Sequence, residues 1–316
     1  MKTDLNFASF LVLLAGTGLA HSQVLFTSTL DSSLGWTTVQ EAMPSSLATY
    51  GYDYSALGIP ASPNGGGSTV GLRLAANANG TVQAITAATV ATFTGQYRIK
   101  FDFYGNSLGA FPTGGTGSTE FIGGGAGFSG AVPRAGASLL TTIEGGSASI
   151  DWRLDKGMST QSVANAYNPS ITTRDNTDAF LSAAFAGQTP PAFQQTTFPS
   201  SQTGTLQNGT TGFKWYVMQI DVDSVLGSAA FSILNPTTSA VTGIGTLSQT
   251  GGAVSVTGSG SLTLLDPFAT SVSNATLADD LVFALFDNYS VTQVPEPAGA
   301  SLFGFVGLLC LRRRRR

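Results

Sequence analysis

The sequence predicts an all-β domain, a sandwich or a barrel, from three features of the 316-residue chain. Glycine supplies 39 residues and proline 13, so turn-forming residues interrupt the chain at short intervals. Between them, hydrophobic and polar residues alternate in short runs, which is the period-2 pattern of a half-buried strand. The 3.6-residue periodicity of an amphipathic helix is almost absent. Short strands between glycine-rich turns are typical of sandwiches and barrels.

The strongest strand is predicted over Tyr97–Tyr104, where apolar and charged residues alternate strictly. A second is predicted over Phe213–Asp223 and a third over Leu281–Val294. The third is apolar on both faces through Phe286, so we expect it to lie in the middle of a sheet. Weaker patterns predict further strands at Val24–Thr29, Val70–Ala75, Thr81–Ile85, Ser147–Leu154, Ala229–Leu234, Ala253–Thr257 and Ser261–Leu265.

Glycine and proline clusters predict the connections between these strands. Three stretches are expected to be loops or glycine-rich strand ends: Gly58–Gly67, Gly114–Gly117 and Gly123–Gly130. Thr189–Gly212 contains three prolines and is expected to be a long surface loop. Because the first and last strands are of comparable strength, we expect the two ends of the domain to meet in one sheet.

Residues 1–22 have the parts of a signal peptide. Lys2 provides the basic start, Phe7–Leu19 the apolar helix, and small residues allow cleavage after Ala20 or Ser22. The alternative is an uncleaved membrane anchor. Either one predicts that the following domain is exported.

The last 23 residues form a three-part tail, residues 294–316. Val294, Pro295, Glu296 and Pro297 end the domain, because proline cannot continue a strand or a helix interior. The apolar run Ala298–Leu311 would span about 21 Å as a helix, short of a hydrocarbon core of about 30 Å. The final five residues are basic and are expected to stay cytoplasmic: Arg312, Arg313, Arg314, Arg315 and Arg316. The alternative is a buried C-terminal helix with a basic end.

This order of a Pro-Glu-Pro triplet, an apolar run and an arginine cluster resembles the PEP-CTERM sorting signal. The resemblance implies export by a Gram-negative bacterium, passage through an inner-membrane intermediate, and recognition by exosortase, a transpeptidase-like membrane enzyme. It also implies that the tail is cut off and that the protein reaches the cell surface or the extracellular matrix. Signal peptidase and exosortase are then partners in transit, and extracellular polysaccharide is a candidate final partner.

Removing both ends leaves a domain of residues 23–293 with little reactive chemistry. Lys2, the five arginines, Asp4 and Glu296 leave with the ends, so eight basic and 16 acidic residues remain and the net charge is −8. A nucleic-acid surface needs clustered cations, which this composition does not supply. The only histidine is His21 and the only cysteine is Cys310. The domain therefore has no disulfide, no cysteine or Ser-His-Asp nucleophile, and no His- or Cys-ligated zinc.

The domain resembles the concanavalin-like (laminin-G-like) jelly roll. Five stretches carry this resemblance: Tyr50–Asn77, Phe93–Asn106, Gly114–Phe121, Phe213–Asp223 and Asp280–Val291. The resemblance implies a jelly-roll β-sandwich flanked by the signal helix and the short C-terminal apolar helix. It implies no particular activity, because one fold hosts many functions.

Some concanavalin-like proteins are glycosidases, which need two carboxylates about 5–10 Å apart. Asp221 with Asp223 and Asp151 with Asp155 have usable spacings on a strand. We interpret both pairs as solvent-facing acids or turn caps. We therefore expect no catalytic residues and no enzyme activity, with a glycoside hydrolase as the last alternative.

Calcium is a candidate structural cofactor, because it binds oxygens of Asp, Asn and backbone carbonyls. The candidate ligands flank the last strand: Asp279, Asp280, Asp287 and Asn288. The alternative is that these are solvated turn residues.

Aromatic rings beside polar residues are the usual elements of a glycan site. Tyr50, Tyr52 and Tyr54 would share one face if this stretch were extended, with Asp53 opposite. They are the candidate glycan contacts, although core aromatics have the same pattern. The favoured function is a non-catalytic structural or adhesive role at the cell surface or in the matrix, with a carbohydrate-binding module as the alternative.

Overall fold

The fold follows from a computed structural model, which describes residues 22–40, 46–76, 83–112, 120–130, 135–146, 150–157, 164–248, 256–266, 277 and 280–294. Gln23–Val294 forms one compact unit. The predicted signal peptide up to His21, the tail from Pro295, and Gly114–Gly117 lie outside the described residues. Most of the strand predicted at Ala253–Thr257 also lies outside them.

Within the described residues, all strands pair antiparallel in two sheets. The larger sheet has eight strands in the order β12 (Ala240–Ser248), β11 (Ser228–Asn235), β10 (Tyr216–Asp223), β6 (Gln96–Asn106), β14 (Phe283–Gln293), β4 (Val70–Ala76) and β3 (Ser46–Asp53), with β1 (Val24–Ser28) paired to β14. The smaller sheet has six: β2 (Trp36–Gln40), β5 (Gln83–Thr89), β13 (Ser259–Asp266), β7 (Phe121–Phe128), β8 (Ala137–Thr142) and β9 (Trp152–Lys156).

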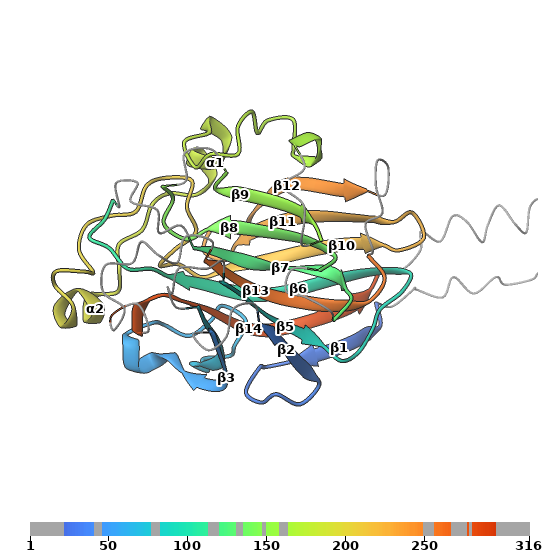
Figure 1. Cartoon of the computed structure of the whole chain (residues 1–316), viewed down its shortest axis with the longest axis horizontal. Helices are drawn as coiled ribbons and strands as arrows, with labels where there is room; N and C mark the ends of the chain where they lie inside the picture. The colour runs from blue at the N-terminus through green and yellow to red at the C-terminus, as the bar shows by residue number, and fades with distance from the viewer. Residues whose placement is uncertain are drawn as a thin grey trace, which may run out of the picture. The chain divides into compact units, whose positions relative to one another are not determined.

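The two sheets stack face to face, with the short helices in the connections (Figure 1). These helices are η1 (Tyr54–Leu57), η2 (Ala164–Ala166), α1 (Ala179–Ala184) and α2 (Ala192–Thr197). The predicted all-β jelly-roll sandwich is therefore confirmed. No helix among the described residues is long and apolar enough to cross a membrane.

The main core lies between the sheets and is built by strand alternation. Residues of β6 with odd numbers, such as Phe101 and Phe103, pack there against Ile122 of β7 and Leu264 of β13. Tyr104 of β6 belongs to a second apolar cluster with Leu285 of β14. Since neighbours along a strand point to opposite faces, this second cluster lies on the outer face of the larger sheet.

The strongest strand predictions are confirmed. β6 and β14 lie side by side inside the larger sheet, and β14 is buried on both faces through Asp287. The first and last strands meet as expected, with Val24 paired to Thr292 and Ser28 to Tyr289. Four strands had no clear alternation in the sequence and were not predicted: β2, β3, β8 and β12.

Of the two alternatives predicted for Gly123–Gly130, the structure shows the glycine-rich strand and not the loop, since most of this stretch is β7, which pairs with β13 and β8. A Cβ atom on Gly123 would lie 1.9 Å from the Leu139 carbonyl oxygen, so glycine is required there by close backbone approach. Thr189–Gly212 contains α2 and is not a simple surface loop, because Gln194 and Gln202 are fully buried.

Candidate functional site

The outer face of the larger sheet carries polar side chains on β6, β10, β11 and β14. Its rows follow from the register of β6, β10, β11 and β14. Lys100 lies opposite Gln219 and Ser290, and Gln219 lies opposite Ser232 on β11. Next along the strands, Arg98 lies opposite Asp221. These side chains all project from the face that is not buried in the main core.

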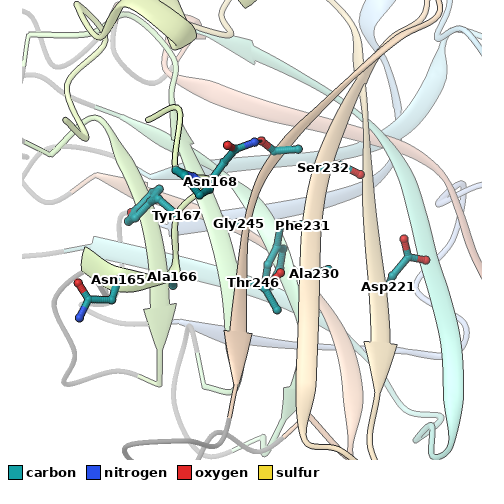
Figure 2. A pocket seen from close by; sticks show the side chains of 12 residues that line it. Asn165, Ala166, Tyr167, Asn168, Asp221, Ala230, Phe231, Ser232, Gly245 and Thr246 are labelled. Carbon is teal, nitrogen blue, oxygen red and sulfur yellow. Dashed lines mark hydrogen bonds between the residues drawn. The ribbon is translucent and has the colours of Figure 1, made fainter. Parts of the chain in front are cut away.

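A cavity of about 510 Å³ opens on this face over β10, β11 and β12. Asp221, Ser232 and Thr246 line it from the strands, and Asn165–Pro169 forms its other wall. Figure 2 shows Asn165, Ala166 and Asn168 along one side and Asp221 on the opposite side. We call this cavity the sheet groove.

Asp221 is held in place by two neighbours. Arg98 Nε forms an ion pair with Asp221 Oδ1 at 2.5 Å, and Gln219 Nε2 donates to Asp221 Oδ2 at 2.9 Å. The Arg98 and Asp221 side chains remain 39% and 38% exposed. The ion pair therefore orients the carboxylate and leaves it accessible from the groove.

The opposite wall is fixed to the edge of β12. Asn168 Nδ2 donates to the Gly243 carbonyl at 3.0 Å, and the Asn168 backbone N–H donates to Ile244 at 2.8 Å. The Tyr167 hydroxyl donates to the Trp152 carbonyl at 2.7 Å, so this hydrogen bond stabilises the wall of the groove and is not directed at a ligand. A Cβ atom on Gly245 would lie 2.2 Å from the Ala166 carbonyl oxygen, which requires glycine at this close approach.

The sheet groove is lined by several kinds of hydrogen-bonding side chain, and the residues at its base are small. Its polar side chains include one carboxylate, two amides and two aliphatic hydroxyls, from Asp221, Asn165, Asn168, Ser232 and Thr246. Its floor includes Ala230 and two glycines. Such a surface accepts a polar molecule with many hydroxyl groups and no large apolar part.

A second polar cluster lies under the 58–68 loop, where Asp102 of β6 stands opposite Asp287 of β14. Asn64 donates to Asp102 from its backbone at 3.0 Å and from Nδ2, and Asn288 Nδ2 donates to Asp102 Oδ2 at 2.9 Å. We call Asp102, Asp287 and their donors the carboxylate clasp, because it ties the loop to the sheet.

Asp287 is held by the same loop. Ser62 Oγ donates to Asp287 Oδ2 at 2.7 Å, the Tyr54 hydroxyl donates to the same atom at 3.2 Å, and the Asn288 N–H donates to Oδ1 at 2.7 Å. Asp102 and Asp287 are almost fully buried. Burial raises the pKa of Asp102, and burial together with the nearby Asp102 charge raises the pKa of Asp287 to about 6.

The predicted calcium ligands are only partly brought together. Asp287 and Asn288 share the clasp, whereas Asp280 is exposed and is not one of their hydrogen-bond partners. Asp279 lies outside the described residues. All four carboxylate oxygens of Asp102 and Asp287 already accept hydrogen bonds from protein donors, so these residues satisfy one another without a cation. Calcium binding by the predicted set stays a prediction.

The three tyrosines do not share one face, so that geometric expectation was wrong. Gly51 has a φ of +68° and the register of β3 shifts between Thr49 and Tyr52, so the stretch is bulged rather than extended. Tyr50 packs against the main core, whereas Tyr52 and Tyr54 belong to the outer-face cluster. Tyr54 is fully buried and Tyr52 lies under the Arg73 guanidinium.

The two acid pairs considered as glycosidase carboxylates, Asp221 with Asp223 and Asp151 with Asp155, do not form a catalytic pair in the groove. Asp221 lines the sheet groove, whereas Asp223 Oδ1 accepts from Val225 and Leu226 and caps the β10–β11 turn. Asp151 and Asp155 are both buried, and Asp151 accepts from the Asn176 N–H, so the interpretation of this pair as solvent-facing was wrong. Of the three described cavities, one contains Asp221 and one contains Asp31 as its single carboxylate, and the third contains none.

The groove residues Asn168, Ser232 and Thr246, and Arg98, which pairs with Asp221, were not predicted as site residues. The alternation of the strands predicts that Arg98 and Asp221 face away from the core, and this signal was available. Their pairing requires the register of β6 on β10, and the position of Asn168 requires the path of a long connection. Neither follows from local sequence.

No protein-family model matches the chain, and no curated protein sequence matches it. Solved structures are similar in fold only. A Bacillus subtilis protein of unknown function with a galectin-like fold is 12% identical, with a TM-score of 0.39, over 86% of this chain and 96% of that one.

The exoplasmic/lumenal domain of VIP36, in a Ca²⁺/Man2-bound form, is 7% identical with a TM-score of 0.44, over 88% of this chain and 89% of that one. Peanut lectin is 9% identical with a TM-score of 0.42, over 87% of this chain and 98% of that one. Similarity at this level assigns neither a ligand nor an activity to this chain.

Proposed function

We propose that the domain is a non-catalytic carbohydrate-binding module that binds a glycan in the sheet groove. The observation that carries this proposal is the groove itself, an accessible polar cavity with one oriented carboxylate, Asp221, between hydroxyl and amide groups. A volume of about 510 Å³ lies within the usual range of about 300–1,000 Å³ for small-molecule sites.

The groove favours hydrogen bonding over aromatic stacking. Among the described residues, the exposed large apolar side chains include one aromatic ring, Phe193, which is on α2 and not on a sheet. Sugar hydroxyls would instead donate to Asp221 and exchange hydrogen bonds with Asn168 and Ser232. The single carboxylate of the groove supports binding over hydrolysis, because glycosidases use two.

The charge of the domain favours a neutral glycan. A net charge of −8 after processing would repel a polyanionic polysaccharide. The Arg98 guanidinium is already paired with Asp221, so it does not provide a free cation for such a ligand.

A glycan array probed with the wild-type protein and Asp221→Asn tests this function. We expect signals for neutral glycans that fall at least about tenfold in the variant, since a hydrogen bond to a charged group contributes roughly 1.5–3 kcal/mol. Asp31→Asn is the matched control, because Asp31 lines a different cavity. An array without hits, with the domain folded, would leave the structural or adhesive role as the better account.

We further propose that the protein is exported and sorted through its C-terminal tail. Support comes from the two sequence signals, residues 1–22 and 294–316, which resemble a signal peptide and a PEP-CTERM signal. Intact-mass measurement of the protein from envelope and medium tests this. We expect a species that lacks Arg312–Arg316, and the sorting proposal fails if every fraction retains them.

A further inference from the structure

Two glutamates that none of the sites above uses lie buried at one end of the sandwich. Glu120 directly precedes β7, and Glu144 follows β8. The Ile143 N–H donates to the Glu120 carbonyl at 2.8 Å, which continues the pairing of these two strands to this end. Glu120 is 0% exposed and Glu144 is 1% exposed.

A third oxygen-bearing side chain reaches the pair from the larger sheet. Ser107, the residue after β6, donates its hydroxyl to Glu120 Oε2 at 2.9 Å. The Glu120 backbone N–H donates to Glu144 Oε1 at 3.2 Å, so the two glutamates are in direct contact. The two glutamates and Ser107 therefore surround one point.

Several oxygens at this end have no hydrogen-bond donor within the described part of the chain. They are Glu120 Oε1, Glu144 Oε2 and Gln202 Oε1. Gln202 is fully buried and donates from Nε2 to the Ser107 carbonyl at 2.8 Å, which places its amide beside Ser107. The unpartnered oxygens thus belong to three side chains around the same serine.

Buried oxygens in this arrangement need a positive partner. A buried carboxylate without a partner is strongly disfavoured, and two in contact repel each other as well. The pair therefore holds either a shared proton or a cation.

We propose that Glu120, Glu144 and Ser107 form a calcium site, with Gln202 Oε1 as a further ligand. These side chains offer six oxygens, and calcium takes six to eight oxygen ligands at about 2.3–2.6 Å. The set contains no nitrogen or sulfur ligand, which disfavours transition metals. Magnesium usually retains several waters and is a poorer match to a site with so little exposure.

The position of the site gives the cation a structural role. It would join the end of β6, the start of β7, the end of β8 and the segment that follows α2. These elements belong to both sheets, so calcium would fasten one end of the sandwich. The site is distinct from the sheet groove and its existence does not depend on glycan binding.

Thermal unfolding of the full-length protein with calcium or with chelator tests the proposal. With calcium at about 100 times its dissociation constant, we expect the melting temperature to rise by roughly 5–10 °C. Glu120→Gln and Glu144→Gln should abolish most of this shift. Asp287→Asn is the matched control, because it also removes a buried carboxyl group but lies in the clasp and not in the calcium site. This variant should keep the calcium-dependent rise in melting temperature.

Metal content supplies a measurement that does not depend on the glutamate variants folding. After equilibrium dialysis against calcium, we expect about one bound ion per wild-type chain and weaker binding by Ser107→Ala. A shared proton makes the opposite prediction. Calcium and chelator would then give the same melting temperature, and no calcium would be retained. That result, or a calcium shift lost in Asp287→Asn but kept in Glu144→Gln, would overturn the proposal.

Discussion

Replacing Asp287 by asparagine should remove a pH-dependent term from the stability of the domain. Burial and the opposing Asp102 raise the pKa of Asp287 from 3.8 to about 6 in the folded protein. The folded state therefore holds this proton more tightly than the unfolded state. The stability that the group contributes is complete below about pH 4 and is lost as the pH rises through about 6.

The size of this term follows from the pKa difference. One pKa unit corresponds to about 1.4 kcal/mol, so ionising Asp287 costs the folded state at most about 3 kcal/mol. In Asp287→Asn, the single carbonyl oxygen can replace Oδ1 as the acceptor for the Asn288 N–H, while the NH2 group takes the place of Oδ2, so the Ser62 hydroxyl must turn and accept from it. At pH 8 the variant should consequently lose less stability, relative to wild type, than it loses at pH 4.5.

Urea unfolding of both proteins at pH 4.5, 6 and 8 measures this difference. Other groups also change their protonation with pH in both proteins. Comparing the variant with wild type at each pH cancels these contributions. If the difference in unfolding free energy between the two proteins does not change with pH, or changes with the opposite sign, Asp287 does not have a raised pKa in the folded protein.

Two further predictions concern residues that support the fold. Gly123→Ala should lose roughly 1–3 kcal/mol of unfolding free energy, because its Cβ would lie 1.9 Å from the Leu139 carbonyl oxygen. Gly243→Ala has its nearest such contact at 3.8 Å and should lose about 1 kcal/mol or less by the same denaturant assay, so equal losses would count against this explanation. Asp178→Ala should cost about 1–2 kcal/mol, because Asp178 caps α1 and also accepts from the Thr172 N–H. An unchanged urea midpoint would show that this cap contributes nothing.

Local pattern was enough to predict the strands that alternate or that are continuously apolar. β6 and β14 have such patterns, and both were found near the predicted bounds. The pattern failed where tertiary contacts decide the structure. The glycines of β7 look like a loop in sequence, yet they are needed where Leu139 and neighbouring strands approach closely.

The candidate site was harder to predict because it depends on register and on long connections. Asp102 and Asp287 are 185 positions apart in the printed sequence, and they meet because β6 pairs with β14. The tyrosine prediction assumed an extended strand, and one bulge at Gly51 reversed the face of Tyr50. The buried pair of Glu120 and Glu144 carries no local signal at all.

The most direct test of the central claim is the affinity of one glycan for the wild-type protein and for Asp221→Asn, measured by isothermal titration calorimetry with the neutral glycan that binds best. If the sheet groove is the binding site, the dissociation constant should rise at least about tenfold in the variant and stay within about twofold in Asp31→Asn. Equal affinities for wild type and Asp221→Asn would contradict binding in the groove.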